Sequence, residues 1–154
     1  MATVKPVPEG YHTVTPGLSI DGCAAAIDLY KKALGAEERH RMPGPGGKIM
    51  HAEIKVGDSI IMLNDLMPEM GVGASKSSFY LYVNDCDASY KRAIDAGFKS
   101  IMPPSDQFWG DRYGGTEDPY GNKWGFSTHK EDVSPEEMPK RQAEWMKQMG
   151  AARK

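Results

Sequence analysis

Two residues that can exchange protons, His51 and Glu53, stand two positions apart in an alternating stretch of the chain. In an extended strand, residues two apart point to the same face, with roughly 7 Å between their Cα atoms. An imidazole and a carboxylate so placed suit a catalytic acid/base pair or two ligands of a metal ion. They also suit a solvated sheet face on which they only satisfy each other. The sequence leaves these interpretations open.

A second group of candidates is aromatic. Tyr80 and Tyr82 alternate with an apolar row, so the two phenols are predicted on the face opposite that row. Trp109 and Tyr113 lie on a glycine-rich segment that could fold over them. Aromatic rings with a few polar tips are typical of a small-molecule pocket. The competing interpretation is that Trp109 only packs at a strand end.

Three further residues have ambiguous chemistry. Arg112 could pair with an anionic ligand, or it could be an ordinary surface arginine. Cys23 and Cys86 each fall in the first turn of a predicted helix, where backbone N–H groups lower the pKa of a thiol. Each also falls on the apolar stripe of its helix, which favours a buried structural thiol.

The elements that position these candidates are predicted from hydrophobic periodicity. The first half predicts one helix among four strands: a strand over 11–21, a helix capped by Asp21 and ending at Leu34, and strands over 37–42, 48–56 and 59–64. A glycine- and proline-containing loop over 65–76 follows.

The second half predicts the same order of elements. They are a strand over 78–83, a helix capped by Asp85 and running through Ala96, strands over 98–102 and 107–116, a turn at Asp118–Asn122, and a last strand over 123–127. The last strand places Trp124 and Phe126 on one face and Gly125 on the other.

The two halves form an internal repeat. Three residues recur 63 positions later: Leu18 as Leu81, Asp21 as Asn84, and Cys23 as Cys86; the turn glycine Gly57 recurs 64 positions later as Gly121. Each half therefore reads as one βαβββ module, which predicts an α+β fold. We expect a single domain over 1–154, with modules at 11–65 and 77–128.

A C-terminal helix is predicted over 134–150. Ser134-Pro135-Glu136-Glu137 has the composition of a capping box with proline in the first turn. Met138, Trp145 and Met149 fall on one stripe, so the helix should dock on something apolar. It could cover its own domain, act as a lid, or strap a dimer together.

Composition excludes several classes of function. A net charge of −2 over 154 residues gives no electrostatic reason to expect nucleic acid or an acidic membrane as a partner. No apolar run approaches the roughly 20 residues that span a bilayer. The first ten residues lack the apolar core of a signal peptide. Two cysteines do not make a disulfide framework, so a cytoplasmic chain with reduced thiols is expected.

Two βαβββ units with a DPxGN turn before the last strand resemble the vicinal oxygen chelate superfamily. That superfamily includes glyoxalase I, fosfomycin- and bleomycin-resistance proteins and extradiol dioxygenases. The stretches VTPGLSIDG, AIDLYKKALGAEE, QFWGDRYG and THKEDVSPEEM look like its PhnB-like branch. The resemblance implies that the modules form a cupped mixed sheet with helices outside. It also implies a homodimer, with two cups built across the subunit interface.

The resemblance further implies four inward positions at which relatives hold a metal. In this chain they fall on Thr15, Ile61, Ser78 and Gly125. Transition metals bound in such sites need His or carboxylate donors, which none of the four supplies. No metal and no cofactor is therefore expected.

The predicted function is binding of a small aromatic or amphipathic molecule in a metal-free cup. The expected ligand-binding residues are His51, Tyr80, Tyr82, Trp109, Arg112, Tyr113 and Gly125, with Gly125 as an open floor for a flat ring. The alternative is a metal-dependent lyase, isomerase or dioxygenase of the glyoxalase class, with His51 and Glu53 as catalytic candidates. A third possibility is a protein–protein regulator that kept only the fold.

Overall fold

A computed structural model describes residues 4–153, so the ends of the predicted domain, 1–3 and 154, lie outside the described residues. The first module contains β1 (Gly17–Ile20), α1 (Cys23–Leu34), β2 (Glu37–Pro43), β3 (Ile49–Val56) and β4 (Ser59–Asp65). Its four strands form a sheet in the order β1-β4-β3-β2, in which only β1 and β4 are parallel.

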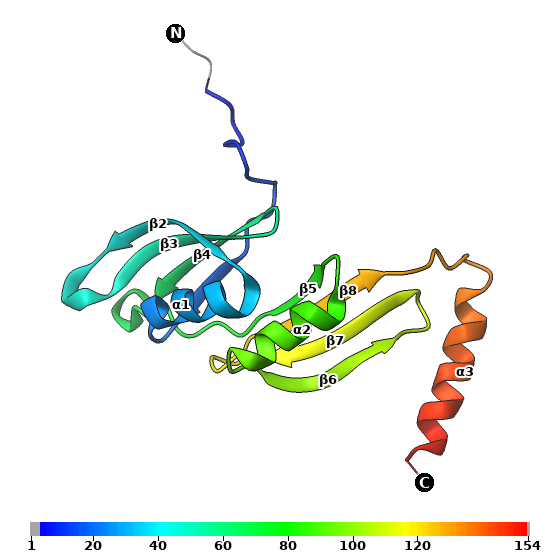
Figure 1. Ribbon diagram of the computed structural model, residues 1–154. Coiled ribbons are helices and arrows are strands. Elements are labelled where there is room, and N and C mark those ends of the chain that lie inside the picture. Colours follow the sequence, from blue (N-terminus) through cyan, green and yellow to red (C-terminus); the bar gives the residue numbers. More distant parts are fainter. Residues whose placement is uncertain (1–3, 154) are drawn as a thin grey trace.

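The second module repeats this plan. It contains β5 (Ser78–Tyr82), α2 (Cys86–Asp95), β6 (Lys99–Asp106), β7 (Asp111–Glu117) and β8 (Lys123–His129), in the sheet order β5-β8-β7-β6. Helix α3 (Met138–Ala151) follows, and Figure 1 shows the two modules side by side with α3 at the outer side of the second. The predicted α+β fold of two βαβββ modules and a C-terminal helix is confirmed.

Strand pairing shows which residues of the two modules correspond. Ser19 pairs with Asn64 as Tyr82 pairs with Ser127, and each member of the second pair lies 63 positions after its counterpart. The hairpin turns differ in length, because Gly57-Asp58 joins β3 to β4 whereas Asp118–Asn122 joins β7 to β8. An alignment counted from the turn glycines is therefore one residue out of register with the strands.

The N-termini of α1 and α2 are capped from distant strands. Asp65, at the end of β4, accepts hydrogen bonds from the backbone N–H groups of Gly22 and Cys23, at 3.1 and 3.0 Å. Thr128, near the end of β8, accepts one from the N–H of Cys86 at 2.8 Å. The predicted cap Asp21 was wrong, since the N-cap of α1 is Gly22 and makes no side-chain bond.

Asp85 is the N-cap of α2, as predicted, because its side chain accepts a hydrogen bond from the N–H of Ala88 at 3.0 Å. Strand β1 begins at Gly17 instead of Tyr11, so Thr15 precedes the strand.

Prolines explain two other shifted boundaries. Strand β6 continues through Pro103 and Pro104, because it is an edge strand and an edge tolerates missing N–H groups. Helix α3 starts at Met138, after a turn in which Ser134 Oγ accepts from the N–H of Glu137 at 3.2 Å. A helix starting at Pro135 would place Pro139 where an intrahelical N–H is needed.

The helix-facing sides of both sheets share one apolar core, and Tyr30 of α1 lies within it. The ring of Tyr30 packs against Phe98, Tyr120 and Trp124 of the second module. Helix α1 also packs along α2 of the second module. The modules thus join through their helical sides, and neither module covers the opposite sheet face of the other.

Helix α3 adds little to this core. None of its residues is buried, and its main aromatic contact is Trp145 against Phe108, with ring centroids 5.5 Å apart. Arg141 also pairs with Glu131, which lies in the connecting segment.

No helix within residues 4–153 is long and apolar enough to cross a membrane.

Candidate functional site

The aromatic candidates of the second module gather on one face of its sheet. Tyr80 lies beside Gly125, while Tyr82 and Tyr113 flank Ser127 on β8 from either side. Because neighbours in register point the same way, all three tyrosines lie on the face turned away from α2. The sequence alternation predicted this arrangement correctly for Tyr80 and Tyr82.

The rings on this face contact one another. Tyr80 and Tyr113 stack with centroids 5.2 Å apart and an interplanar angle of 13°, and Tyr82 lies tilted against Tyr80 at 5.3 Å. Tyr80 is 45% exposed and Tyr82 is 68% exposed. Trp109 joins the group, since its Nε1–H donates a hydrogen bond to the Tyr80 hydroxyl at 3.1 Å. We call Tyr80, Tyr82, Trp109 and Tyr113 the aromatic face.

Asp111, which the sequence did not suggest, organises the aromatic face. Its carboxylate is 2% exposed, and its Oδ2 accepts hydrogen bonds from the hydroxyls of Tyr80 at 2.7 Å and Tyr82 at 3.1 Å. The same oxygen accepts from Trp109 Nε1–H at 3.2 Å. Burial raises the pKa of Asp111, but the hydrogen bonds it receives, first from His129 and then from the tyrosines, outweigh burial and lower that pKa below its usual value.

His129 lies between two carboxylates. Its Nδ1 is 2.8 Å from Oδ1 of Asp111, and its Nε2 is 2.8 Å from Oδ1 of Asp132. These contacts, Asp111 first, raise the pKa of His129, so the ring holds a proton more strongly than a free histidine. The only sequence signal for this cluster was strand alternation, which places Asp111 and Tyr113 on the same face of one strand. Alternation did not place His129, which lies on a neighbouring strand, beside them.

Gly125 is not the open floor that was predicted. A Cβ built on Gly125 would collide with the ring of Tyr113, which lies over this glycine. The flat ring that the missing side chain accommodates is therefore the protein's own.

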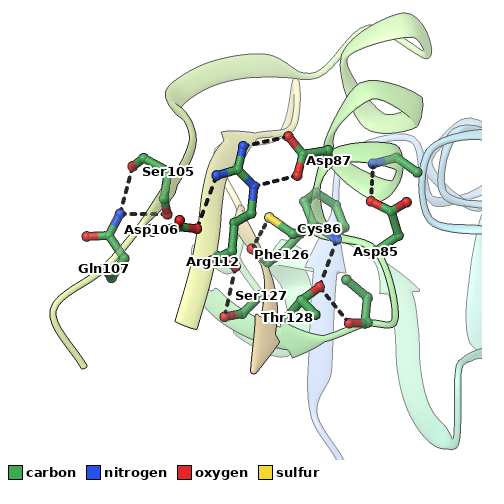
Figure 2. A network of polar contacts seen from close by, with 12 residues as sticks. Asp85, Cys86, Asp87, Ser105, Asp106, Gln107, Arg112, Phe126, Ser127 and Thr128 are labelled. Atoms are coloured by element: carbon green, nitrogen blue, oxygen red, sulfur yellow. Dashed lines mark hydrogen bonds and ion pairs between the residues drawn. The ribbon is translucent and has the colours of Figure 1, made fainter. Parts of the chain in front are cut away.

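Arg112 lies on the other face of the sheet, where Figure 2 shows it between two carboxylates. Its Nε and Nη2 donate to Asp87 of α2 at 2.6 and 2.9 Å, and its Nη1 donates to Asp106 at 3.1 Å. The predicted grouping of Arg112 with the tyrosines was wrong, because adjacent residues of a strand point to opposite faces.

His51 and Glu53 lie on the polar sheet face of the first module. His51 Nε2 is 3.3 Å from Glu53 Oε1, and the rings of His51 and His40 have centroids 6.2 Å apart. A hydrogen bond from Tyr11 chiefly lowers the pKa of Glu53 against the effect of burial, and Arg39 lies 3.8 Å from its Oε2. The pair is thus part of a charged surface, separate from the aromatic face.

The four metal positions inferred by resemblance do not form one set. Ile61 pairs with Ile54 and lies in the helix-side core, 4% exposed. In the register of the strands, the counterpart of Gly125 is Met62, which pairs with Glu53 on the polar face. Counting from the turn glycines caused this error. The hydroxyls of Thr15 and Ser78, the thioether of Met62 and a glycine still do not fit a transition metal ion.

Within residues 4–153, no group of three or more His, Cys, Asp or Glu side chains is arranged to hold a metal ion. Cys23 and Cys86 are both buried and free. Burial raises the pKa of the Cys23 thiol to about 12 and also raises that of Cys86. Neither thiol has the lowered pKa of a reactive cysteine.

A groove of about 930 Å³ runs between the modules, along the edge of β5 that pairs with no strand. Its lining includes the apolar side chains of Val56, Phe79 and Leu81, the rings of Tyr80 and Tyr82, and several polar side chains. The groove therefore joins the aromatic face to an apolar strand edge.

Known proteins share this architecture. Residues 12–126 match the family model of the glyoxalase/bleomycin resistance protein/dioxygenase superfamily. The uncharacterized protein Mb0911c of Mycobacterium bovis is 37% identical over 134 residues, which cover 81% of this chain and 88% of that protein.

Two solved structures are similar in fold and in sequence. Protein PA1353 of Pseudomonas aeruginosa is 27% identical with a TM-score of 0.63, covering 78% of this chain and 99% of that one. TnmS3, an antibiotic binding protein from Streptomyces sp. CB03234, is 25% identical with a TM-score of 0.61, covering 84% and 99%. With the family match spanning most of its length, this chain belongs to the glyoxalase/bleomycin resistance protein/dioxygenase superfamily.

Proposed function

We propose that this protein binds a small aromatic or amphipathic molecule on its aromatic face and needs no metal to do so. The observation that carries the proposal is the exposure of Tyr80 and Tyr82 in a groove whose lining also includes Val56, Phe79 and Leu81. A contiguous exposed aromatic patch that lines a groove is typical of a ligand-binding site. TnmS3, which shares the fold, is described as an antibiotic binding protein.

The chemistry of the face favours binding over catalysis. Burial raises the pKa of Tyr80 and the hydrogen bond to Asp111 raises that of Tyr82, so neither phenol readily becomes a phenolate base. The alternative, a metal-dependent lyase, isomerase or dioxygenase, would have to use His51 and Glu53 with ligands from elsewhere. We also propose that the chain belongs to the PhnB-like branch of its superfamily and that it is located in the cytoplasm. Two free thiols support the location.

We further propose a homodimer in which a second copy completes each cup. Within one chain the modules join through α1 and α2, so the polar face of one module does not close over the other. The free edge of β5 and the exposed side chains of Trp145 and Met149 on α3 are also surfaces that a monomer leaves uncovered. In such a dimer, His51 and Glu53 of one subunit would face the tyrosines of the other.

Calorimetry and tryptophan fluorescence with EDTA present test the binding proposal. The panel contains an anthraquinone, a benzoquinone, an S-aryl glutathione conjugate and N-methylquinolinium. We expect at least one saturable binder whose affinity EDTA does not change. Loss of binding in EDTA, or turnover of a panel compound only after metal is added, would replace the binding function with the enzyme alternative.

Light scattering at micromolar concentration tests the dimer. We expect twice the mass of the 154-residue chain, which is 16.9 kDa. A monomeric mass would refute the shared cup while leaving the binding assay to decide whether the aromatic face works alone.

A further inference from the structure

The aromatic face presents rings to a ligand, and the hydroxyls of its two most exposed tyrosines, Tyr80 and Tyr82, are held by a buried carboxylate. Both Tyr80 and Tyr82 direct their O–H groups to Oδ2 of Asp111, and Trp109 directs its N–H to the same atom. Three donors from three ring edges thus converge on one buried oxygen. A ligand on the outer side meets the π surfaces, whose electrostatic potential is negative.

The cluster of charges directly behind the rings is also negative. Asp111 and Asp132 flank a single histidine, so a protonated His129 leaves one net negative charge in this cluster. Arg112, which directly follows Asp111 in the sequence, is held on the opposite face of the sheet by Asp87 and Asp106. Lys99 and Lys123 share the face, but both flank Glu117 in register, six residues along β7 from Asp111.

We propose that the ligand of the aromatic face is an organic cation, namely an aromatic compound with a quaternary or protonated nitrogen in or next to its ring. This inference rests on the proposed binding function and adds the charge of the ligand to it. A cation over tyrosine and tryptophan rings is attracted by their quadrupoles, and the Asp111 carboxylate adds to that attraction. The flat part of such a ligand can stack on the exposed ring of Tyr82.

Other ligand classes suit the face less well. A neutral hydrogen-bonding ligand would find the hydroxyls of Tyr80 and Tyr82 and the indole N–H of Trp109 already used by Asp111. An anion would meet negative ring surfaces, with Arg112 out of reach on the far side of the sheet. The order of affinity should therefore be cation, then neutral ring, then anion.

Three probes of nearly equal shape test this order in calorimetry at pH 8 on the full chain: N-methylquinolinium as the cation, 4-methylquinoline as the neutral ring, and quinoline-4-carboxylate as the anion. We expect the cation to bind roughly tenfold more tightly than the neutral ring, with the anion weakest. Equal affinity for the cation and the neutral ring would overturn the inference and leave the proposed binding function standing. Failure of all three probes and of the wider panel would overturn both.

Variants of the most exposed ring separate the π surface from the hydroxyl. Tyr82→Leu should abolish most of the cation preference, whereas Tyr82→Phe should keep it because the ring remains. Tyr90→Leu, on α2 with its hydroxyl bonded to Ser100, is the control and should leave the preference unchanged.

Asp111→Asn keeps the size of the buried side chain and removes its charge, so it should also reduce the preference. Its circular dichroism must match the wild type for the result to count. A preference that survives both Tyr82→Leu and Asp111→Asn would contradict the proposed recognition.

Discussion

The two modules have the same topology and pack on a shared core, yet their uncovered faces differ. The first carries a charged surface with His51, Glu53 and Arg39, and the second carries tyrosines around a buried carboxylate. Helix-facing positions are restrained in both modules because they fill one close-packed core. The comparison teaches that the repeat preserves the core, while the opposite faces are free to hold different chemistry.

A buried aspartate stabilises each module, but the two make different contacts. Asp65 accepts hydrogen bonds only from backbone N–H groups of its own module, those of Gly22, Cys23 and Ile49. Asp118 accepts five, including bonds from the Trp124 indole at 2.9 Å and from the Tyr30 hydroxyl of the first module at 2.6 Å. Asp118 therefore links the modules, whereas Asp65 organises only one.

The largest effect is expected from Asp118→Ala. It leaves several buried donors without an acceptor, including those of Tyr30 and Trp124, and should lower the free energy of unfolding by about 3–5 kcal/mol. Asp65→Ala should cost less, about 1–3 kcal/mol, because it removes a cap within one module. Urea denaturation measures both. An equal or larger loss in Asp65→Ala would contradict the linking role of Asp118.

Two glycines on the polar faces provide the next comparison. Gly125→Ala should destabilise the protein by about 1–3 kcal/mol, because the new methyl group must displace the Tyr113 ring. Gly17→Ala, in β1 of the first module, meets no atom within 4 Å and should be nearly neutral. Thermal denaturation of the two variants checks this difference. The double variant Gly125→Ala/Tyr113→Leu should recover part of the loss if the ring is its cause.

Ligand affinity distinguishes the two faces directly. Trp109→Ala should weaken the tightest panel compound roughly tenfold, through lost stacking and apolar burial. His51→Ala, on the charged face of the first module, should weaken it by less. Calorimetry of both variants gives the comparison. A larger effect at His51 would show that the charged face contributes more to binding than the aromatic face does, and would favour the enzyme alternative.

The smallest effect concerns the pH dependence of stability. The pKa of His129 is raised by Asp111 and then by Asp132, so its contribution is fully present below the unfolded pKa of about 6.5 and is lost as pH rises through the folded pKa. The urea midpoint of the wild type should fall slightly over this range, and that of His129→Asn should not. His12→Asn, on the exposed N-terminal arm, should behave like the wild type. If the urea midpoint of His129→Asn falls with pH as steeply as that of the wild type, another group is responsible for the pH dependence.

Local periodicity by itself determined much of this protein. Alternation placed Tyr80 and Tyr82 opposite the apolar row of β5, and the helical stripe of Cys23, Ile27 and Tyr30 is buried as it predicts. These assignments succeed because the face on which a side chain lies depends only on neighbours within a few positions. The repeat of 63 positions predicted the two-module fold, because each half shows the same order of locally encoded strands and helix.

Only the tertiary structure decided which distant groups meet. Asp111 gathers donors from Tyr80 and Tyr82, which lie 31 and 29 positions away on another strand, and Asp65 caps a helix 42 positions away. Such contacts depend on strand register and turn length, and an error of one residue moves a side chain to the opposite face, as it did between Ile61 and Met62. The spacing of residues within one strand does not determine the register, because the register is set by the pairing of strands that lie far apart in the chain.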